Sequence, residues 1–348
     1  MKKALKLSIF FLAVAIIATV AIIIIIKNND DKPTTKQEEQ INRSPLDEAS
    51  IFHDYVFEQI VRRVLTLPEG EIDTEALKQV TQLDLSGPTT TDTSVKIQNL
   101  YGLRYFPNLT DLVLDYNAFE TLNGIEKLTK LKTLSLEYCR INDATILKNL
   151  PNLEELSLKN NNIIDFSFLS ELQNLKRLDI SQNDMSSLNI LKSGNYHTLE
   201  YLNISNNTIT DISFLSNLKT IQVLDISGLE ITDLSILQNI SALSELYASS
   251  NKIGDLMPLH NMQTLTKLDL SQNRIKDISP LSTCIALQEI DISSNSIEDI
   301  QPIKNLTKLK KLNVDSNYIQ SFIPIYESSI DEVSAKNNTA VYNPNQKG

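Results

Sequence analysis

"LTKLDLSQNRIKDISPLSTCIA" occupies residues 265–286, and the next 22 residues, 287–308, read "LQEIDISSNSIEDIQPIKNLTK". The two stretches place their apolar residues, an asparagine and an aspartate at matching positions. Units of this kind begin at Leu109, Leu131, Leu153, Leu175, Leu199, Ile221, Leu243, Leu265, Leu287, Leu309 and Ile330, and nine of the ten intervals lie within one residue of 22. A spaced pattern held over so many units indicates a solenoid, in which each unit buries its apolar face against its neighbours.

Each unit follows the pattern L-x-x-L-x-L-x-x-N-x-I-x-D-I-x-x-L-x-x-L-x-x, whose positions we number 1 to 22. Positions 4 and 6 alternate as on the buried face of a short strand. Position 9 is asparagine in nine of the eleven units. A side-chain amide there can bond turn backbone groups that are costly to bury unpaired. Cys139 and Leu229 hold this position in the other two units; since Leu229 cannot form such bonds, we predict a loosened ladder at that point.

The second half of each unit returns the chain to the start of the next strand. Its apolar positions, such as Ile275, Ile278 and Leu281, are expected to face the core. Asp277 followed by Pro280 predicts a turn or a short 3₁₀ piece, because proline is tolerated only in the first turn of a helix. Twenty-two residues therefore leave room for one short strand and a compact return.

The segments "IKDISPLSTC" (275–284) and "ITDISFLSNL" (209–218) resemble the 22-residue leucine-rich repeats of bacterial internalins, a likeness that covers residues 46–338. Residues 51–87 match the N-terminal cap of that family. The resemblance implies an α/β solenoid: a leucine-rich-repeat horseshoe with a parallel concave sheet, short 3₁₀ or irregular convex segments and a helical N-terminal cap. It also implies that cysteine can replace the asparagine at position 9.

The cap can be recognised from the residues themselves. Phe52, Val56, Ile60 and Val64 recur every four residues, as on one face of a helix. Asp73 can N-cap a second helix. We expect these helices to cover the open edge of the first strand, as the terminal unit of a solenoid requires.

The N-terminus predicts a membrane anchor. Residues 7–26 form a run of 20 residues without charge, the length that crosses the apolar core of a bilayer as a helix, and lysines precede the run. We interpret it as an uncleaved, single-pass signal anchor with the body outside the cytoplasm; cleavage after Ala21, which would give a secreted protein, stays open. The predicted organisation is a signal anchor over 1–27, a disordered tether over 28–45, a helical cap over 46–79, leucine-rich repeats over 80–338 and a C-terminal tail over 339–348.

Composition argues against several classes of function. The net charge of −11 disfavours nucleic acid, because phosphate binding needs a basic face. His53, His197 and His260 have no nucleophile or metal ligand at a useful spacing, so we expect no enzyme, metal site or cofactor. The two cysteines lie in units six apart, too far for a disulfide. We find no Leu-Pro-x-Thr-Gly wall-sorting signal and no immunoglobulin-like domain after the repeats, so we expect N-terminal tethering in place of wall anchoring.

Positions 3, 5 and 7 of each unit should point outward on the concave face, where a partner could bind. Tyr201, Val223 and Tyr247 fall on three successive strands and suggest an aromatic hot spot, although scattered apolar surface residues are common. An acidic ladder, with Asp225, Asp269 and Asp291, could await a basic partner or a cation, or could be the default strand sequence of such repeats. A second candidate pair, Tyr116 and Tyr138, holds position 8 near the N-terminal end.

The function that these observations favour is a protein–protein interaction module at the bacterial cell surface. A protein partner would bind the concave face of a monomeric ectodomain, as in an adhesin or a receptor-like protein. The alternative is a scaffold or regulatory subunit of an envelope complex, whose partner would lie in the same membrane.

Overall fold

The computed structural model describes residues 50–194, 196–343 and 345, all within one compact unit that runs from Ser44 to Gly348. The predicted signal anchor (1–27) and tether (28–45) lie outside the described residues. Within the part of the chain that the structure describes, no helix is both long and apolar enough to cross a membrane.

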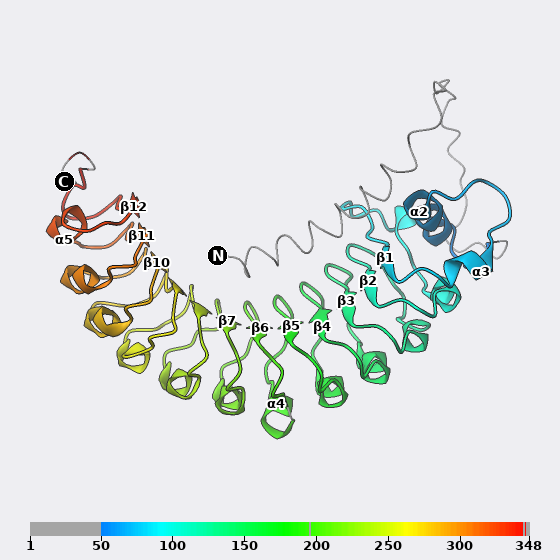
Figure 1. The fold of residues 1–348 in the computed structure, drawn as a ribbon, viewed down its shortest axis with the longest axis horizontal. Coiled ribbons are helices and arrows are strands. Elements are labelled where there is room, and N and C mark those ends of the chain that lie inside the picture. The colour runs from blue at the N-terminus through cyan, green and yellow to red at the C-terminus, as the bar shows by residue number, and fades with distance from the viewer. Residues whose placement is uncertain (1–49, 195, 344, 346–348) are drawn as a thin grey trace. The chain divides into compact units, whose positions relative to one another are not determined.

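A single parallel sheet of twelve strands lines the inner side of the arc, with the strands in chain order from β1 to β12 (Figure 1). Adjacent strands pair residues that hold the same repeat position, as in Lys267 with Glu289 and Asp269 with Asp291, so the sequence period becomes a translation from one strand to the next. Each strand has three residues: β1 Gln82–Asp84, β2 Asp111–Val113, β3 Thr133–Ser135, β4 Glu155–Ser157, β5 Arg177–Asp179, β6 Tyr201–Asn203, β7 Val223–Asp225, β8 Glu245–Tyr247, β9 Lys267–Asp269, β10 Glu289–Asp291, β11 Lys311–Asn313 and β12 Glu332–Ser334. The predicted leucine-rich-repeat horseshoe is confirmed.

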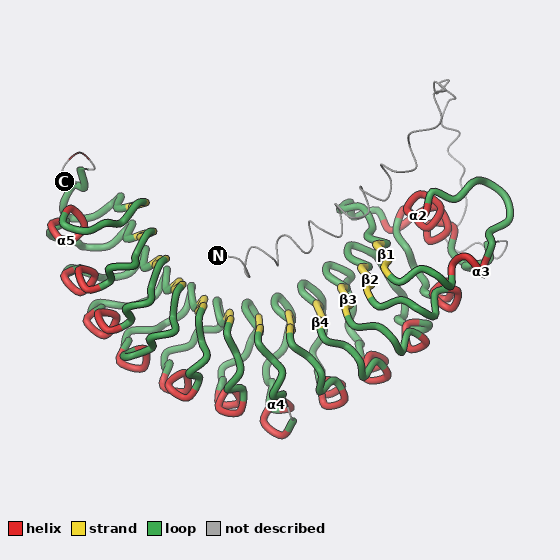
Figure 2. The backbone as a smooth tube through the Cα atoms, viewed as in Figure 1, coloured by secondary structure: helices red, strands yellow, loops and turns green. Residues whose placement is uncertain are grey.

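Short helices occupy the outer, convex side of the arc (Figure 2). The aspartate at position 13 starts most of them; in one, the amide of Ser279 donates to Asp277 Oδ1 at 2.8 Å. The predicted short 3₁₀ pieces are therefore confirmed. After η2 Thr93–Val95, which lies in the long loop of the first unit, the series is η3 Tyr101–Tyr105, η4 Ile125–Lys127, η5 Thr145–Asn149, η6 Ser167–Glu171, α4 Ile190–Ser193, η7 Ser213–Asn217, η8 Ser235–Asn239, η9 Met257–Leu259, η10 Ser279–Thr283, η11 Gln301–Asn305 and α5 Ile323–Tyr326.

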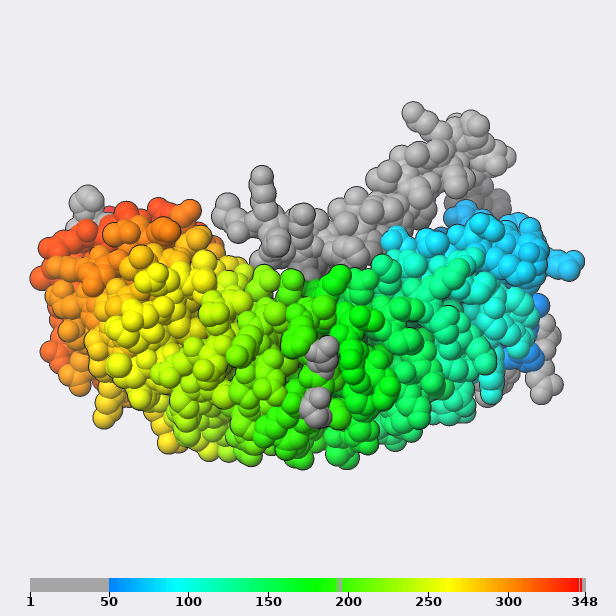
Figure 3. All heavy atoms as spheres, turned by 60° about the horizontal axis from the view of Figure 1, so that its bottom comes forward, coloured from blue at the N-terminus to red at the C-terminus, as the bar shows by residue number. Residues whose placement is uncertain are grey.

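The core runs between the sheet and these convex helices. Ile275, Ile278 and Leu281 are buried, as predicted. The longer unit at 175–198 places Tyr196 in this core, where its hydroxyl donates to the Leu169 carbonyl at 2.7 Å. Figure 3 turns the convex side toward the viewer, where the side chains of successive repeats pack into a continuous surface.

The position-9 side chains form the predicted ladder. Asn161 accepts from the Ile141 amide at 2.9 Å and donates to the carbonyl oxygens of Leu136 and Leu158 at 2.8 and 2.9 Å. Cys139 takes over one of these bonds, because its Sγ donates to the Leu114 carbonyl at 3.2 Å. Its thiol and that of Cys284 are free and buried.

Leu229 interrupts only the side-chain part of this ladder. It is buried, with an exposed fraction of 2%, and packs in the core. The backbone pairing continues past it: Ile204 N donates to Asp225 O at 3.0 Å and Ile226 N to Tyr247 O at 2.8 Å. The position-9 ladder is thus interrupted at Leu229, as predicted, whereas the strands keep their own backbone bonds.

The N-terminal cap consists of α2 Tyr55–Leu65 and α3 Thr74–Leu77, and Asp73 caps α3 as predicted. Asp54 joins the cap to the first repeat: Oδ1 accepts from Phe57 N at 3.0 Å, and Oδ2 accepts from Gln98 N and Asn99 N at 2.8 and 3.1 Å. Burial raises the pKa of this carboxyl against the effect of those bonds. Gly102 permits close contact, since a Cβ there would lie 2.7 Å from the Phe52 ring.

Candidate protein-binding surface

The concave face is built from side chains that the core does not use. In β1 to β11 the central residue is buried, in β12 it is half-buried, and the residues on either side of it, at positions 3 and 5, turn outward. Position 7 is the second residue after the strand, and position 8 lies beyond it at the rim. The strands thus present parallel rows of outward side chains along the inner side of the arc, one row for each repeat position.

The structure separates the three residues of the predicted hot spot. Tyr201 and Val223 are direct cross-strand partners at position 3, whereas Tyr247 stands in the position-5 row beside Asp225 and Asp269. The Arg177 guanidinium lies 4.0 Å from the Tyr201 ring centroid and covers it, a contact that the sequence reading did not include. Burial raises the pKa of the Tyr201 phenol. Tyr201 is therefore already engaged by the protein itself.

Tyr247 also has an internal partner. Its hydroxyl donates to Glu245 Oε2 at 2.8 Å on the same strand. Burial and then this carboxylate raise the pKa of its phenol. The ring is half-buried and stands at one end of a hollow in the sheet.

The carboxylates of the predicted acidic ladder accept hydrogen bonds at the ends of the strands. Asp269 Oδ1 accepts from the amide and hydroxyl of Ser271 at 2.9 and 2.7 Å, and Asp291 Oδ1 accepts from those of Ser293 at 2.9 and 2.6 Å. Asp225 accepts from the amide two residues on at 3.0 Å, and burial raises its pKa. Among the described residues, no group of three or more His, Cys, Asp or Glu is placed to hold a metal ion.

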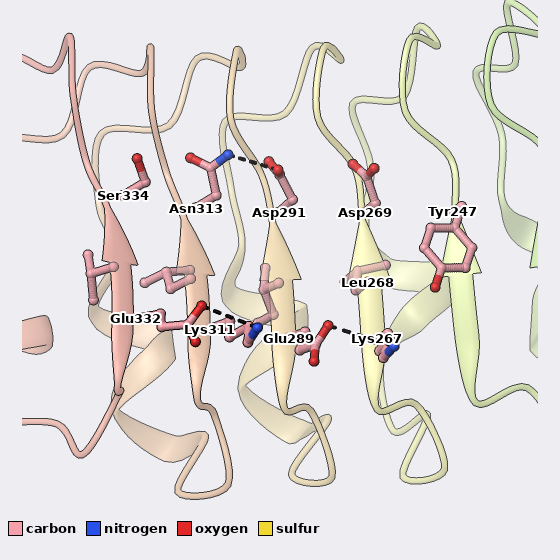
Figure 4. A pocket seen from close by; sticks show the side chains of 13 residues that line it. Tyr247, Lys267, Leu268, Asp269, Glu289, Asp291, Lys311, Asn313, Glu332 and Ser334 are labelled. Atoms are coloured by element: carbon pink, nitrogen blue, oxygen red, sulfur yellow. Dashed lines mark hydrogen bonds and ion pairs between the residues drawn. The ribbon is translucent and has the colours of Figure 1, made fainter. Parts of the chain in front are cut away.

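The concave face is hollowed over β8 to β12, a region we call the C-terminal hollow, with a volume of about 510 Å³ (Figure 4). One row of its lining alternates in charge and pairs internally: Lys267 Nζ lies 3.8 Å from Glu289 Oε2, and Lys311 Nζ lies 3.2 Å from Glu332 Oε2. In the other row, Asn313 Nδ2 donates to Asp291 Oδ2 at 2.8 Å. The second row consists of Tyr247, Asp269, Asp291, Asn313 and Ser334.

At the other end of the sheet, Tyr116 and Tyr138 form a stacked pair. Their ring centroids lie 4.8 Å apart with an interplanar angle of 8°. Both residues have a positive φ, 60° and 56°, at the turn that follows the strand. The structure thus brings this predicted pair together, at the rim of β2 and β3; we call it the tyrosine pair.

Two acidic residues beside the tyrosine pair were missed by the sequence reading. Asp115 Oδ1 accepts from Ser135 Oγ at 2.6 Å and from Glu137 N at 2.8 Å, and Glu137 Oε1 accepts from Ser157 Oγ at 2.7 Å. Burial, with the nearby Glu137 and Asp84 charges, raises the pKa of Asp115 to about 6. Burial also raises the pKa of Glu137. Their position in the repeat was the available signal, because position 7 is serine in six later units.

Comparison with known proteins gives matches along most of the repeat region. A family model described as the leucine-rich repeat domain of the endo-β-N-acetylglucosaminidase EndoS matches residues 109–207. A model for two copies of a leucine-rich repeat matches residues 197–239, 241–283 and 285–327. No curated protein sequence matches the chain.

Similar solved structures identify the family of the chain. Internalin InlF from Listeria monocytogenes is 31% identical, with a TM-score of 0.75 and coverage of 85% of each chain. Internalin C2 from the same species is 27% identical, with a TM-score of 0.52 over 54% of this chain and 83% of that one. The plant peptide hormone receptor RGFR1 in complex with RGF2 shares the fold at 20% identity, with a TM-score of 0.58 over 77% of this chain and 50% of that one. With the 22-residue repeat, the capped parallel sheet and this degree of identity to InlF, the chain belongs to the internalin-type leucine-rich repeat proteins.

Proposed function

We propose that the chain is a protein-interaction module of the bacterial cell surface, adhesin-like or receptor-like, which binds a protein partner on its concave face. The observation that carries the proposal is the C-terminal hollow, where five consecutive strands present side chains that the core does not need (Figure 4). A pre-formed face of this kind loses little conformational entropy on binding.

The fold supports this class of function. Leucine-rich repeat domains are protein–protein interaction modules and are typically non-enzymatic, and the plant peptide hormone receptor RGFR1 has been solved in complex with RGF2. We propose the same for this chain: a protein partner, with no enzymatic activity of its own.

The cell-surface part of the proposal rests on the sequence of residues 7–26. An uncleaved apolar run of that length would hold the repeats on the outer side of the membrane as a single-pass protein. N-terminal sequencing of the protein isolated from membranes tests this: a start at or before the run supports the anchor, whereas a start at Ile22 gives a secreted protein.

Site-specific cross-linking tests the binding face. A photoreactive phenylalanine analogue would replace Tyr247 in the hollow or, as a matched control, Met257 in η9, whose side chain is 56% exposed on the convex side. With the full chain displayed on bacterial cells, we expect adducts with a partner protein from position 247 and few from position 257. Adducts from position 257 alone would place the binding face on the convex side and reject the proposal. A partner found in the same membrane would identify a scaffold subunit in place of an adhesin.

A further inference from the structure

The tyrosine pair is part of a ladder that the repeat generates. Position 8 of successive units lies at the same rim, and its ring spacing of 4.8 Å matches the spacing of about 4.8 Å between adjacent strands. Tyr138 is followed in this ladder by Asn160, so only two units carry rings. The strand spacing therefore holds the two rings parallel, with the outer face of Tyr116 directed toward the first unit.

The first unit has no side chain at the position that matches Tyr116. Gly87 holds position 8 there, and its amide donates to the Asp115 carbonyl at 2.8 Å. A Cβ on Gly87 would lie 2.8 Å from the Tyr116 carbonyl oxygen, so no larger residue fits without a shift. Among the described residues, Tyr138 is the one ring stacked on Tyr116, and no cation lies over it. We call the side of this half-exposed ring that faces Gly87, on which no described ring or cation stacks, its free face.

The carboxylates near this face form no ion pair within the described residues, although the Lys159 charge acts on Glu137. Within the described part of the chain, no lysine or arginine forms an ion pair with Asp84, Asp111, Asp115 or Glu137. Burial raises the pKa of the Tyr116 phenol; the charges of Glu137 and Asp115 act in the same direction, and that of Lys159 acts against them. Over β1–β4, the outward positions 3, 5 and 7 hold five carboxylates (Asp84, Asp111, Asp115, Glu137 and Glu155) and one lysine (Lys159), a formal charge of −4.

The same sheet already contains the contact that this site lacks. Arg177 lies over the Tyr201 ring at 4.0 Å; burial lowers the pKa of its guanidinium, and the charge of Glu155 opposes that effect. A guanidinium is planar, stacks on aromatic faces and donates to carboxylates in a fork, whereas an ammonium acts as a point charge. At the N-terminal end, positions 3, 5 and 7 of β1–β4 supply the carboxylates but hold no arginine.

We propose that the N-terminal third of the concave face binds a segment of the partner protein through an arginine, which stacks its guanidinium on the free face of Tyr116 and pairs with the surrounding carboxylates. This inference rests on the proposed function and names the chemistry of the partner. The charge excludes an acidic segment, and a purely apolar one would leave the carboxylates without a counter-charge.

Peptide binding by the full chain in mild detergent tests the inference. The probes are three fluorescent hexapeptides, Gly-Arg-Gly-Ser-Gly-Arg and its versions with lysine or citrulline in place of arginine, followed by anisotropy at pH 7 and low salt. Citrulline keeps the shape of arginine and removes its charge. We expect the arginine peptide to bind about 3- to 10-fold more tightly than the lysine peptide, and the citrulline peptide to bind most weakly.

Tyr116→Asn is the decisive variant, because Asn160 and Asn206 hold the same position with a positive φ in other units. We expect it to weaken arginine-peptide binding about 5- to 10-fold, whereas Tyr116→Phe should retain most of the affinity. Tyr318→Asn removes a tyrosine that is 58% exposed elsewhere on the surface and should change nothing.

Equal affinity of wild type and Tyr116→Asn for the arginine peptide would overturn the inference, as would equal affinity for the arginine and citrulline peptides. Either result, together with intact cross-linking at position 247, would leave the proposed function standing. Loss of cross-linking at position 247 with retained arginine selectivity would instead reject the proposed binding face and leave the arginine inference standing.

Discussion

The two ends of the concave sheet contain the same hydrogen-bonded motif with different neighbours. At the N-terminal end, Asp115 accepts from Ser135 Oγ at 2.6 Å and from the Glu137 amide at 2.8 Å. At the C-terminal end, Asp315 accepts from Ser334 Oγ at 2.8 Å and from the Lys336 amide at 2.6 Å. The backbone imposes one geometry on both, but the residue that supplies the amide is an acid in one case and a base in the other.

The difference extends across each third of the face. Outward positions 3, 5 and 7 carry five carboxylates over β1–β4 and five over β9–β12, but one lysine in the first set and three in the second. At the C-terminal end, two of those lysines pair with glutamates on adjacent strands (Figure 4). The repeat therefore decides where carboxylates can stand, and the placement of cations decides which end is left to attract a partner.

The first way to probe this comparison is to change what the two ends share. Asn161→Ala and Asn295→Ala each remove a buried amide that joins two repeats. We expect each to lower the free energy of unfolding by roughly 2–4 kcal/mol, because backbone groups are left buried without partners. Urea denaturation followed by circular dichroism measures both. A much larger loss at one site would contradict the view that the ends differ only in their outward residues.

The second prediction concerns the motif itself. Asp115→Asn keeps an Oδ1 that can accept from Ser135 and Glu137, and it removes a buried charge next to a like charge. At pH 7 we expect a gain in unfolding free energy of roughly 1–3 kcal/mol, the upper limit corresponding to a pKa raised from 3.8 to about 6. Asp315→Asn is the matched control and should give no gain, because Lys336 stands beside that carboxylate.

The raised pKa of Asp115 determines how the stability difference between wild type and Asp115→Asn changes with pH. Below pH 3.8, Asp115 is protonated in both the folded and unfolded states and costs nothing. As the pH rises from 3.8 to 6, the unfolded state loses its proton first, so wild-type stability falls and the full cost is present above pH 6. The advantage of Asp115→Asn should therefore shrink toward pH 4. An advantage that is constant from pH 4 to pH 7 would show that packing, and not ionisation, is its cause.

The sequence sufficed for most of the fold because the repeat fixes both period and register. Position equivalence alone pairs Lys267 with Glu289 and Arg177 with Tyr201 across adjacent strands. The contact of Arg177 with Tyr201 could thus have been anticipated, but the rotamer that lays the guanidinium over the ring depends on packing. The junction of Asp54 with Gln98 and Asn99 joins residues 44 and 45 positions apart and has no counterpart in the repeat.

The candidate site was less predictable, for a similar reason. Asp269 and Asp291 were identified as adjacent acids, and the serine two residues after each one signals the turn that they close. The carboxylate charge that is left uncompensated at each end depends on which lysines pair with which carboxylates. Only the distances between their atoms show this. The prominence of the tyrosine pair comes from its parallel rings and from the absence of a side chain at Gly87, which only the structure places together.

The last prediction makes the C-terminal end resemble the N-terminal end. Lys267→Gln with Lys311→Gln removes both internal ion pairs and changes the formal charge of that third from −2 to −4. Exposed pairs contribute about 0–1 kcal/mol each, so we expect only a small loss in unfolding free energy. In a Tyr116→Asn background, the double variant should raise arginine-peptide affinity by about 2- to 3-fold through charge alone. Because the Tyr247 hydroxyl is bonded to Glu245 and this end has no stacked tyrosine pair, the affinity should stay below that of wild type. Full recovery would mean that net charge, and not the free face of Tyr116, selects the arginine.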